Sequence, residues 1–323
     1  MRIFRHLTGL PDFIAGTSVA IGNFDGVHRG HQAVIDKAGF HATELGIPLL
    51  VITFDPHPRR FFSPDDPQFQ LTPFPSKARC LEAMGVENLL LVNFDSETAN
   101  LTKDEFVDDI LIDGLRAKHV TVGNDFVFGV GRSGDVEYLR SRSRQKVFGL
   151  SVVDLVKDTK EKVFSSTNIR KCLTDGFPEE AAQLLGRAWE IEGCVIKGDQ
   201  RGRTIGFPTA NISLEDYIVP ALGVYAVWAG VQEANEIVWH MGCANIGRRP
   251  TFDKTDTNCE VYIFDFCDDI YGKLLRVLLV DYIRPEKKFD GISQIKEQIE
   301  LDCRDARVLL EGIKVNDVRS KPG

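Results

Sequence analysis

The sequence lacks the features that would mark it as fibrous, disordered or membrane-spanning. Glycine (28) and proline (14) are not enriched among its 323 residues, which excludes a collagen-like chain and a largely disordered one. No apolar run approaches the roughly 18 residues that cross a membrane, and the first residues contain no apolar signal core. We therefore expect a globular protein with no membrane partner.

Paired cysteine motifs are missing as well. The seven cysteines are scattered and odd in number, and none belongs to a C-x-x-C motif, so neither a disulfide framework nor a zinc ribbon is predicted. They indicate reduced thiols and a cytoplasmic location. The G-x-G-x-x-G fingerprint and the Walker A loop are also absent, so any nucleotide must bind through another motif.

The sequence also lacks an excess of positive charge. Lysine and arginine total 39, aspartate and glutamate total 47, and the formal net charge is −8. Proteins that bind nucleic acid by bulk electrostatics need a basic domain, so no nucleic-acid partner is expected. A local basic pocket for a phosphorylated small molecule is compatible with this charge.

What is present is a change of pattern near residue 186. The length predicts two domains, which we place at 1–186 and 187–323. The first alternates apolar strands with helices, as in a parallel sheet covered on both faces. The second has successive strands without crossover helices, as in an antiparallel sandwich or barrel, and one amphipathic helix closes the chain. The predicted strands are 17–21, 49–54, 88–94, 120–122, 151–156, 190–196, 224–231, 237–243, 259–264 and 274–283, and the first-half helices include 31–45, 76–84, 106–115 (after a capping box at Thr102 and Glu105), 166–173 and 178–185.

The first candidate site is Gly22–His31 (GNFDGVHRGH), between a predicted strand and a predicted helix. Glycines let the backbone approach an anion, and a helix N-terminus presents free N–H groups and a positive dipole end. His28 and His31, three residues apart, lie on one side of the helix and could stabilise a polyphosphate under attack. Two other interpretations stay open: a tight turn with two surface histidines, and a metal site that includes Asp25.

The second candidate site is Gly198–Asn211, a glycine-rich, basic segment between two strand-like runs. Its backbone amides and Arg201 or Arg203 could hold phosphates. Thr209 and Asn211 are two residues apart and would face the same way in an extended segment, where their oxygens could ligate Mg²⁺. Taken alone, the segment is better interpreted as a turn with a polar strand.

Four segments of the first half resemble a known family. Gly22–His31 resembles the G-x-F-D-G-x-H-x-G-H motif of the nucleotidyltransferase superfamily, in its flavin adenylyltransferase version, and three further segments, Thr53–Pro58, Val122–Gly129 and Ser165–Arg170, resemble that family's motifs in the same order. The resemblance implies that His28 and His31 contact the ATP phosphates and the transition state. It implies ATP or phosphate binding at Gly22, Asn23, Phe24, Gly30, Ser165, Ser166, Thr167 and Arg170, and flavin binding at Asp55, Pro56, His57, Pro58 and Asp125.

The second half resembles the riboflavin kinase family. Gly198–Asn211 resembles the family's motif G-x-x-x-G-R-x-x-G-[FY]-P-T-A-N, and further matches follow at 223–227, 245–252 and 260–266. The resemblance implies that Thr209 and Asn211 bind Mg²⁺ with ATP, and that Glu260 is the general base for a ribityl hydroxyl. Without it, Glu260 would be a solvated charge at a strand start. The implied ATP-binding residues are Gly198, Gly202, Arg203, Gly206, Pro208, Thr209 and Asn211, and the implied flavin-binding residues are Arg284 and Phe289.

Together the two halves are similar to the bacterial bifunctional riboflavin kinase/FAD synthetase family. This implies a doubly wound, Rossmann-like parallel-sheet nucleotidyltransferase domain followed by an antiparallel β-barrel kinase domain with a closing helix. It implies ATP, riboflavin, FMN and FAD as substrates or products, with Mg²⁺ accompanying ATP. Three alternatives remain: another acceptor at the first site, a non-catalytic flavin carrier, and a nucleic-acid module on the barrel. No oligomeric state is predicted.

Overall fold

The structure, a computed structural model, describes residues 1–7, 9–146, 148–157, 161–198, 202, 205–234, 236–250 and 255–319. These residues divide into two compact units. The first contains residues 1–66 and 77–164, and the second contains residues 67–76 and the described chain from residue 165 onward. Helices α7 (Ser166–Thr174) and α8 (Pro178–Leu185) therefore belong to the second compact unit, whereas the predicted domain boundary follows them. The assignment of functions to 1–186 and 187–323 stays a prediction.

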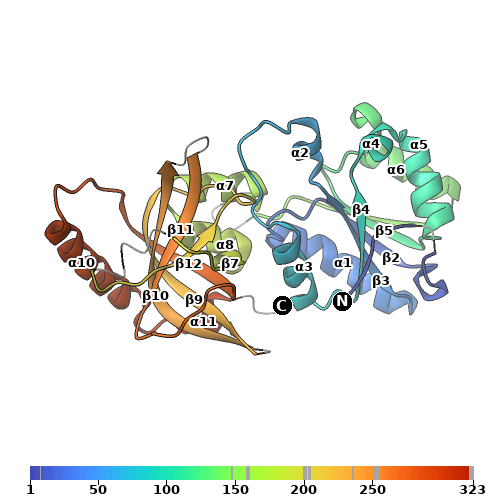
Figure 1. The fold of residues 1–323 in the computed structure, drawn as a ribbon. Helices are drawn as coiled ribbons and strands as arrows, with labels where there is room; N and C mark the ends of the chain where they lie inside the picture. Colours follow the sequence, from blue (N-terminus) through green and yellow to red (C-terminus); the bar gives the residue numbers. More distant parts are fainter. Residues whose placement is uncertain are drawn as a thin grey trace. The chain divides into compact units, whose positions relative to one another are not determined.

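The first unit is built on a parallel six-stranded sheet in the order β1-β4-β3-β2-β5-β6 (Figure 1). Its central strands are buried along their length, which explains their continuous apolar sequences. The strand order reverses between β2 and β5, so the predicted doubly wound sheet is confirmed. The strands are β1 Arg2–Phe4, β2 Ser18–Ile21, β3 Leu49–Asp55, β4 Asn88–Asn93, β5 His119–Gly123 and β6 Gly149–Val153.

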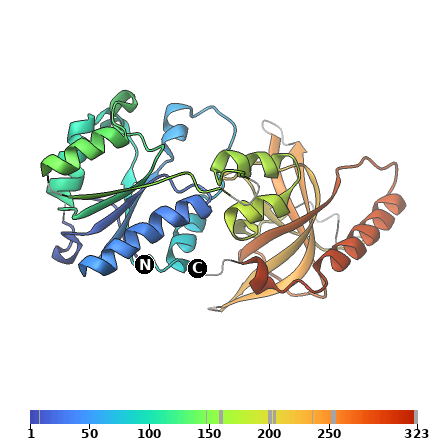
Figure 2. The same ribbon diagram turned by 180° about the vertical axis from the view of Figure 1, so that it is seen from behind.

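Helices cover both faces of this sheet. Helix α1 (Arg29–Leu45) packs on one face, and the π-helix η2 (Phe106–Gly114) and α6 (Val136–Lys146) lie on the other (Figures 1 and 2). The predicted capping box is confirmed, since Thr102 and Glu105 each bond the other's backbone N–H. The remaining short helices are η1 Asp12–Ile14, α2 Pro58–Phe62, α3 Phe74–Ala83, α4 Ser96–Asn100, α5 Lys103–Glu105 and η3 Val130–Arg132, and residues 74–76 of α3 are grouped with the second unit.

The second unit contains an antiparallel six-stranded sheet in the order β7-β12-β9-β10-β11-β8. The sheet curls, and Ile196, just beyond β7, forms a bridge with Asn211 of β8, so that its two edges meet. Helix α10 (Ile292–Leu310) packs on the outer face, as Figure 2 shows for the predicted closing helix. The strands are β7 Trp189–Cys194, β8 Ala210–Ser213, β9 Gly223–Glu233, β10 Glu236–Pro250, β11 Thr255–Ile263 and β12 Leu274–Pro285, and a short helix α11 (Val315–Val318) follows α10.

Candidate active sites

The carboxyl edge of the parallel sheet gathers three of the predicted motifs. The turn after β2 begins at Gly22, the turn after β3 contains Pro56 and His57, and the turn after β5 contains Asp125. Because β2 lies between β3 and β5, these turns meet at the point where the strand order reverses. Ligands of open α/β sheets bind at this position. The fold thus brings together motifs that are about a hundred residues apart in the chain.

The turn after β2 is tightly built. Phe24 and Val27 have positive φ angles of 47° and 43°, and Gly26 has φ 90°. The turn also leaves little room for side chains at its glycines. A Cβ atom at Gly22 would lie 3.1 Å from the Phe24 ring, and one at Gly30 would lie 3.1 Å from the His28 ring. The glycines therefore allow the backbone to fold closely around the entrance to α1.

His28 and His31 form a stacked pair at the N-terminus of α1. Their ring centroids lie 3.5 Å apart at 19°. His28 caps the helix, since its Nδ1 accepts a hydrogen bond from the backbone N–H of His31 at 3.2 Å. This bond assigns the proton of a neutral His28 ring to Nε2. Among the described residues no His, Cys, Asp and Glu cluster could hold a metal ion, so the alternative metal site with Asp25 is not formed.

Lys77, on α3, is a buried cation that sequence reasoning missed. Its side chain is 2% exposed, and its Nζ donates to the backbone carbonyl of Asn23 at 2.7 Å and to Thr53 Oγ1 at 3.4 Å. Burial lowers its pKa from 10.5, and the carboxylates of Asp25 and Asp55 oppose that shift. Lys77 therefore stabilises the turn after β2 through its hydrogen bond to the backbone carbonyl of Asn23. A lysine within an amphipathic helix gives no local sign of burial. Its partner Asn23 is distant in the chain, so no pattern in the sequence indicates the contact.

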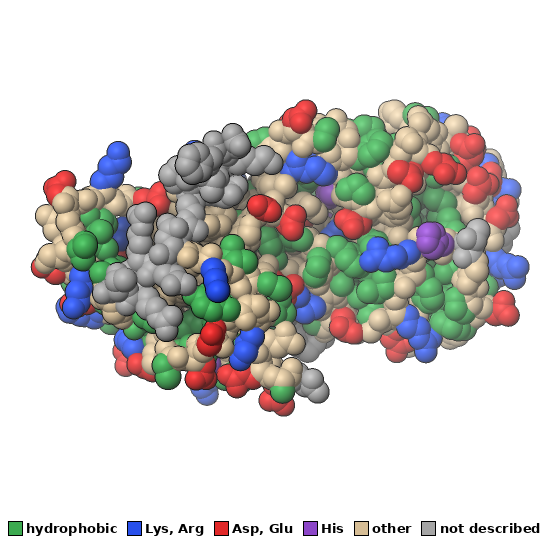
Figure 3. All heavy atoms as spheres, viewed as in Figure 1, with side chains coloured by type: hydrophobic (Ala, Val, Ile, Leu, Met, Phe, Trp, Pro, Cys, Tyr) green, Lys and Arg blue, Asp and Glu red, His purple; other side chains and the backbone are tan. Residues whose placement is uncertain are grey.

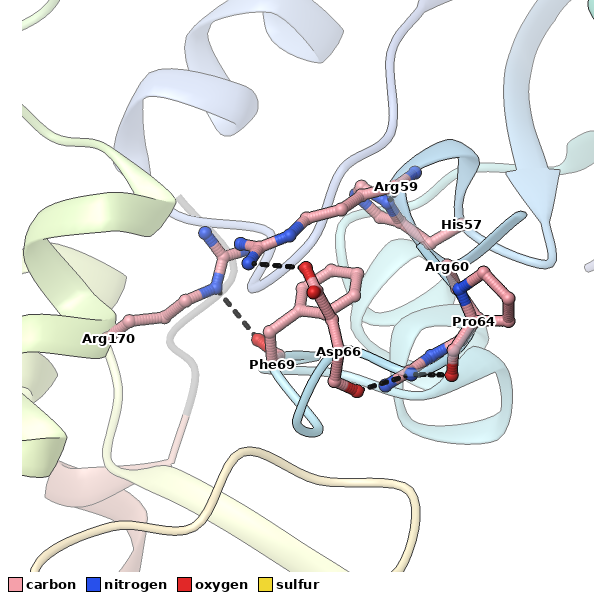
Figure 4. A network of polar contacts seen from close by, with 7 residues as sticks. All are labelled: His57, Arg59, Arg60, Pro64, Asp66, Phe69 and Arg170. Atoms are coloured by element: carbon pink, nitrogen blue, oxygen red, sulfur yellow. Dashed lines mark hydrogen bonds and ion pairs between the residues drawn. The ribbon is translucent and has the colours of Figure 1, made fainter. Parts of the chain in front are cut away.

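The segment after β3 is held by its own polar contacts (Figure 4). His57 is buried and caps α2, accepting the backbone N–H of Arg59 at its Nδ1. Arg59 pairs with Asp66 at 3.2 Å, and Arg60 donates to the carbonyls of Pro64 and Asp66. The two arginines fold the chain back after the Pro56–Pro58 segment. Asp125, in contrast, is exposed after β5.

The Ser165–Arg170 motif starts α7, in the second compact unit. Ser165 caps the helix by accepting the backbone N–H of Asn168 at 3.2 Å. Arg170 donates through Nε to the Phe69 carbonyl at 2.8 Å, and its guanidinium lies 5.4 Å from the Phe69 ring centroid (Figure 4). Ser166 is half-buried and Thr167 exposed. The predicted phosphate contacts of this motif stay predictions.

The second candidate site lies on the curled sheet rather than at its loops. Strand register places Asn211 of β8 directly opposite Glu260 of β11, which in turn lies opposite Asn245 of β10. Directly opposed residues share one face of a sheet. The same row continues through Val224 of β9 to Arg284 of β12. A predicted metal ligand, the predicted base and a predicted flavin-binding residue therefore share one row.

Asn211 carries the clearest sign of a ligand site. Its side chain is 4% exposed, yet its buried Oδ1 has no hydrogen-bond partner among the residues that the structure describes. Buried amide oxygens are normally satisfied, so an unpaired one needs an explanation. A side chain at Gly198 would come within 2.8 Å of the Asn211 amide, so glycine is needed to leave that space. An oxygen ligand aimed into such a space fits Mg²⁺.

The glycine-rich segment before β8 is described only in part. Arg201 and Arg203 lie outside the described residues. The carbonyl of Gly202 accepts the N–H groups of Ile205 and Phe207, and Gly206 has φ 94°. Pro208 is exposed and Thr209 half-buried. The described residues 205–209 lead directly into the row that begins with Asn211.

Arg284 is held rigidly at the far end of the row. Its Nε and one terminal nitrogen donate to the two carboxylate oxygens of Asp302 on α10, at 2.7 and 2.6 Å. Asp302 is nearly buried and also accepts from Gln298 at 2.9 Å. The guanidinium lies 6.0 Å from the ring centroid of Phe289. Sequence reasoning missed Asp302, because the pair forms only when α10 packs on β12.

One face of the molecule carries charged side chains of both signs (Figure 3). On the face drawn in Figure 3, acidic and basic side chains are interspersed. In the part of the chain that the structure describes, no helix is long and apolar enough to cross a membrane.

Comparisons with known proteins identify the family of this chain. A family model described as FAD synthetase matches residues 11–168, and one described as riboflavin kinase matches residues 185–310. A bifunctional riboflavin kinase/FMN adenylyltransferase of Listeria monocytogenes is 42% identical over 292 residues, covering 90% of this chain and 91% of the relative. That of Bacillus subtilis is 41% identical over 297 residues, covering 90% and 92%.

A solved structure from Streptococcus pneumoniae, described as a macrolide-efflux protein, has the same fold. Its TM-score is 0.81 at 34% identity, covering 93% of this chain and 96% of that chain. The two family models and these relatives define an enzyme class with two ATP-dependent activities, a kinase and an adenylyltransferase. The chain belongs to the bifunctional riboflavin kinase/FMN adenylyltransferase family.

Proposed function

We propose that this chain converts riboflavin to FMN and then FMN to FAD, using one ATP in each step. We assign the adenylyltransfer to residues 1–186 and the phosphorylation to residues 187–323. The observation that supports this most strongly is the presence of two unlike polar sites: the His28–His31 pair at a helix N-terminus and the Asn211–Glu260 pair across two strands.

At the first site, an FMN phosphate oxygen attacks the α-phosphorus of ATP. A bond to that phosphorus forms, the bond to the bridging oxygen of the β-phosphate breaks, and pyrophosphate leaves. His28 and His31 stabilise the negative charge that develops on the phosphoryl oxygens, assisted by the positive end of α1. We assign the flavin side of this site to Asp55, His57 and Asp125, at the same sheet edge.

At the second site, the 5′-hydroxyl oxygen of riboflavin attacks the γ-phosphorus of ATP, and ADP leaves. Glu260 accepts the hydroxyl proton, a role that needs a carboxylate within hydrogen-bond reach of the acceptor. The glycine-rich turn before Asn211 holds the nucleotide. Arg284, fixed by Asp302, and the Phe289 ring near it border the flavin.

We assign Mg²⁺ to Thr209 and Asn211 at the second site. The Oδ1 of Asn211, which has no partner within the described part of the chain, and the space that Gly198 leaves beside it support this assignment. When bound with ATP, the ion would neutralise negative charge on the polyphosphate. We also place the enzyme in the cytoplasm, in keeping with seven cysteines that are all free in the structure.

The test is a time course of the full chain with riboflavin, ATP and Mg²⁺, with the flavins separated by chromatography. We expect FMN to appear first and FAD to follow, with pyrophosphate released in step with FAD. A chain that phosphorylates riboflavin but adenylylates a different phosphorylated acceptor in preference to FMN would contradict the assignment of the first site. Flavin binding without turnover would contradict both.

A further inference from the structure

Residues 67–76 lead from α2 into α3 in the first half of the sequence, and the FAD synthetase family model covers them. They nevertheless belong to the second compact unit. Phe69, Leu71 and Ser76 are buried, with exposed fractions of 4%, 0% and 3%. Connecting segments usually run over the surface of a protein, so this burial indicates that the segment forms part of the interior of the second unit.

Three successive carbonyls hold this segment in place. The carbonyls of residues 69–71 each accept one hydrogen bond from the second half of the chain. Their donors are Arg170 Nε, the backbone N–H of Ile218 and Trp189 Nε1, each at 2.8 Å. The donors come from α7, from the connection after β8 and from β7, so the segment joins three parts of the second unit.

Ser76 and Tyr217 form a buried pair of hydroxyl groups. Ser76 Oγ and the Tyr217 hydroxyl share a hydrogen bond of 2.8 Å, and Tyr217 is 4% exposed. The Tyr217 oxygen also accepts the backbone N–H of Glu192, on β7, at 3.1 Å. Burial raises the pKa of Tyr217 above its ordinary value, so the phenol stays protonated at neutral pH. One phenol thus holds two neighbours from distant parts of the sequence.

Tyr217 lies in the connection that follows Asn211. Strand β8, which contains Asn211, has four residues and lies at one end of the strand order, with β11 as its neighbour. The backbone N–H of Leu214 donates to the Thr257 carbonyl at 3.1 Å, and Tyr217 is the next anchored side chain. A strand this short has few ladder hydrogen bonds of its own. The anchored connection therefore helps to fix Asn211 opposite Glu260.

We propose that Ser76 and Tyr217 are positioning residues for the phosphorylation of riboflavin. Their hydroxyl pair fixes the connection after β8 and thereby the place of Asn211. The next residue of α3, Lys77, instead holds the carbonyl of Asn23 in the turn after β2. Two adjacent residues of one helix therefore serve different reactions. This inference rests on the proposed assignment of the kinase to the second unit.

The experiment measures two rates in the full chain: FMN formation from riboflavin, and FAD formation from added FMN. Ser76→Ala should slow FMN formation by about five-fold, which is the effect of one buried hydrogen bond. Tyr217→Phe should slow it by about 20-fold, because the Ser76 and Glu192 hydrogen bonds are both lost. The double variant should be no slower than Tyr217→Phe alone, since the two substitutions remove the same shared bond.

A positioning role also predicts where the loss appears. The decrease should be in kcat, and the KM for riboflavin should stay unchanged, because Arg284 at the flavin end of the row keeps its own contacts. Hydrogen exchange of the backbone amides of residues 212–218 should become faster in Tyr217→Phe. Exchange in the turn after β2 should not change. Both variants should form FAD from FMN at the rate of the unaltered chain.

Two control variants sharpen the experiment. Tyr271→Phe alters an exposed tyrosine of the same unit and should leave both rates unchanged. Lys77→Met should show the opposite pattern to Ser76→Ala, with slower FAD formation and unchanged FMN formation. The inference is wrong if Ser76→Ala slows the two reactions equally, or if the two single losses multiply in the double variant. An unaltered chain that does not phosphorylate riboflavin would instead refute the proposed function.

Discussion

The two candidate sites are built in opposite ways. In the first unit, the polar residues lie in turns beyond the ends of parallel strands, as His28 and His31 do at the entrance to α1. In the second unit, Asn211 and Glu260 lie within paired strands, opposite one another. The first arrangement depends on tight turns and a helix N-terminus, and the second on strand register.

This difference makes the two sites separable by substitution. A turn can be altered without disturbing the sheet beneath it, whereas a strand residue can be replaced by an isostere without changing the register. Because His28 and His31 lie in the first compact unit and Asn211 and Glu260 lie in the second, each activity serves as a folding control for substitutions of the other pair. The predictions below use that control, from the largest expected effect to the smallest.

Replacing both histidines of the stacked pair gives the largest effect. The double variant His28→Ala with His31→Ala should lower FAD formation from FMN by about 10³-fold or more, because two groups that stabilise the developing charge are lost. FMN formation from riboflavin should stay within about two-fold of the unaltered chain. Both rates are measured by chromatography of the flavins.

The control for the histidine pair is a second pair in the same unit. His41 and His119 are stacked at 3.7 Å, at the amino end of β5, away from the candidate site. Replacing His41 by Asn should leave the rate of FAD formation nearly unchanged. An equal loss in both variants would mean that the stacked rings act through folding rather than through phosphate chemistry.

Glu260→Gln should have the next largest effect, on the other activity. Loss of the base should slow phosphorylation of riboflavin by about 10²-fold, since general bases typically contribute that much. Adenylylation of added FMN should be unaffected. The matched control is Glu236→Gln, at an exposed position that starts β10. If Glu260→Gln phosphorylates riboflavin at an unchanged rate, Glu260 is not the general base.

Lys77→Met tests whether the buried cation supports the first site. Its Nζ holds the carbonyl of Asn23, so its loss should loosen the turn after β2 and slow FAD formation by roughly ten-fold. Riboflavin phosphorylation should not change. Lys118→Met, which alters an exposed lysine of the same unit, is the control. Equal rates of FAD formation in the two variants would show that Lys77 has only a packing role.

The smallest expected effect concerns pH and the His41–His119 pair. Burial, and then the charges of His41 and Lys37, lower the pKa of His119 from 6.5 to about 4. The unfolded chain therefore binds a proton at His119 more readily than the folded chain does. The contribution of neutral His119 to folding stability is complete above pH 6.5, its unfolded pKa, and is lost as the pH falls toward its folded pKa of about 4. The melting temperature should therefore fall by about 2–4 °C more in the unaltered chain than in His119→Asn between pH 7 and pH 5. An equal fall in melting temperature in the two chains between pH 7 and pH 5 would contradict this prediction.

Much of the fold was predictable because burial leaves a local pattern. Strands β3 and β4 are continuous apolar runs, and the predicted bounds differ from the observed ones by a single residue. Strand β10, in contrast, extends from Glu236 to Pro250, well beyond the predicted 237–243, because its outer face carries polar residues and glycines. The three-residue β1 and the polar β8 were not among the predicted strands, since neither has an apolar pattern of its own.

Candidate site residues could be named from the sequence where they lie close together in the chain. The spacing of His28 and His31 and the alternation of Thr209 and Asn211 single these residues out, but their roles are implied by the resemblance to the two families and stay predictions. Lys77 and Asp302 were missed because each acts on a residue distant in the chain. Their partners, Asn23 and Arg284, become neighbours only after helices pack on sheets.

Complementation tests the central claim, two independent sites in one chain, most directly. The His28→Ala, His31→Ala chain should stop at FMN, and the Glu260→Gln chain should make almost no FMN from riboflavin. Mixed in equal amounts with riboflavin, ATP and Mg²⁺, the two chains should together produce FAD, because FMN released by one is used by the other. A mixture that yields no more FAD than either chain alone would contradict the two-site account.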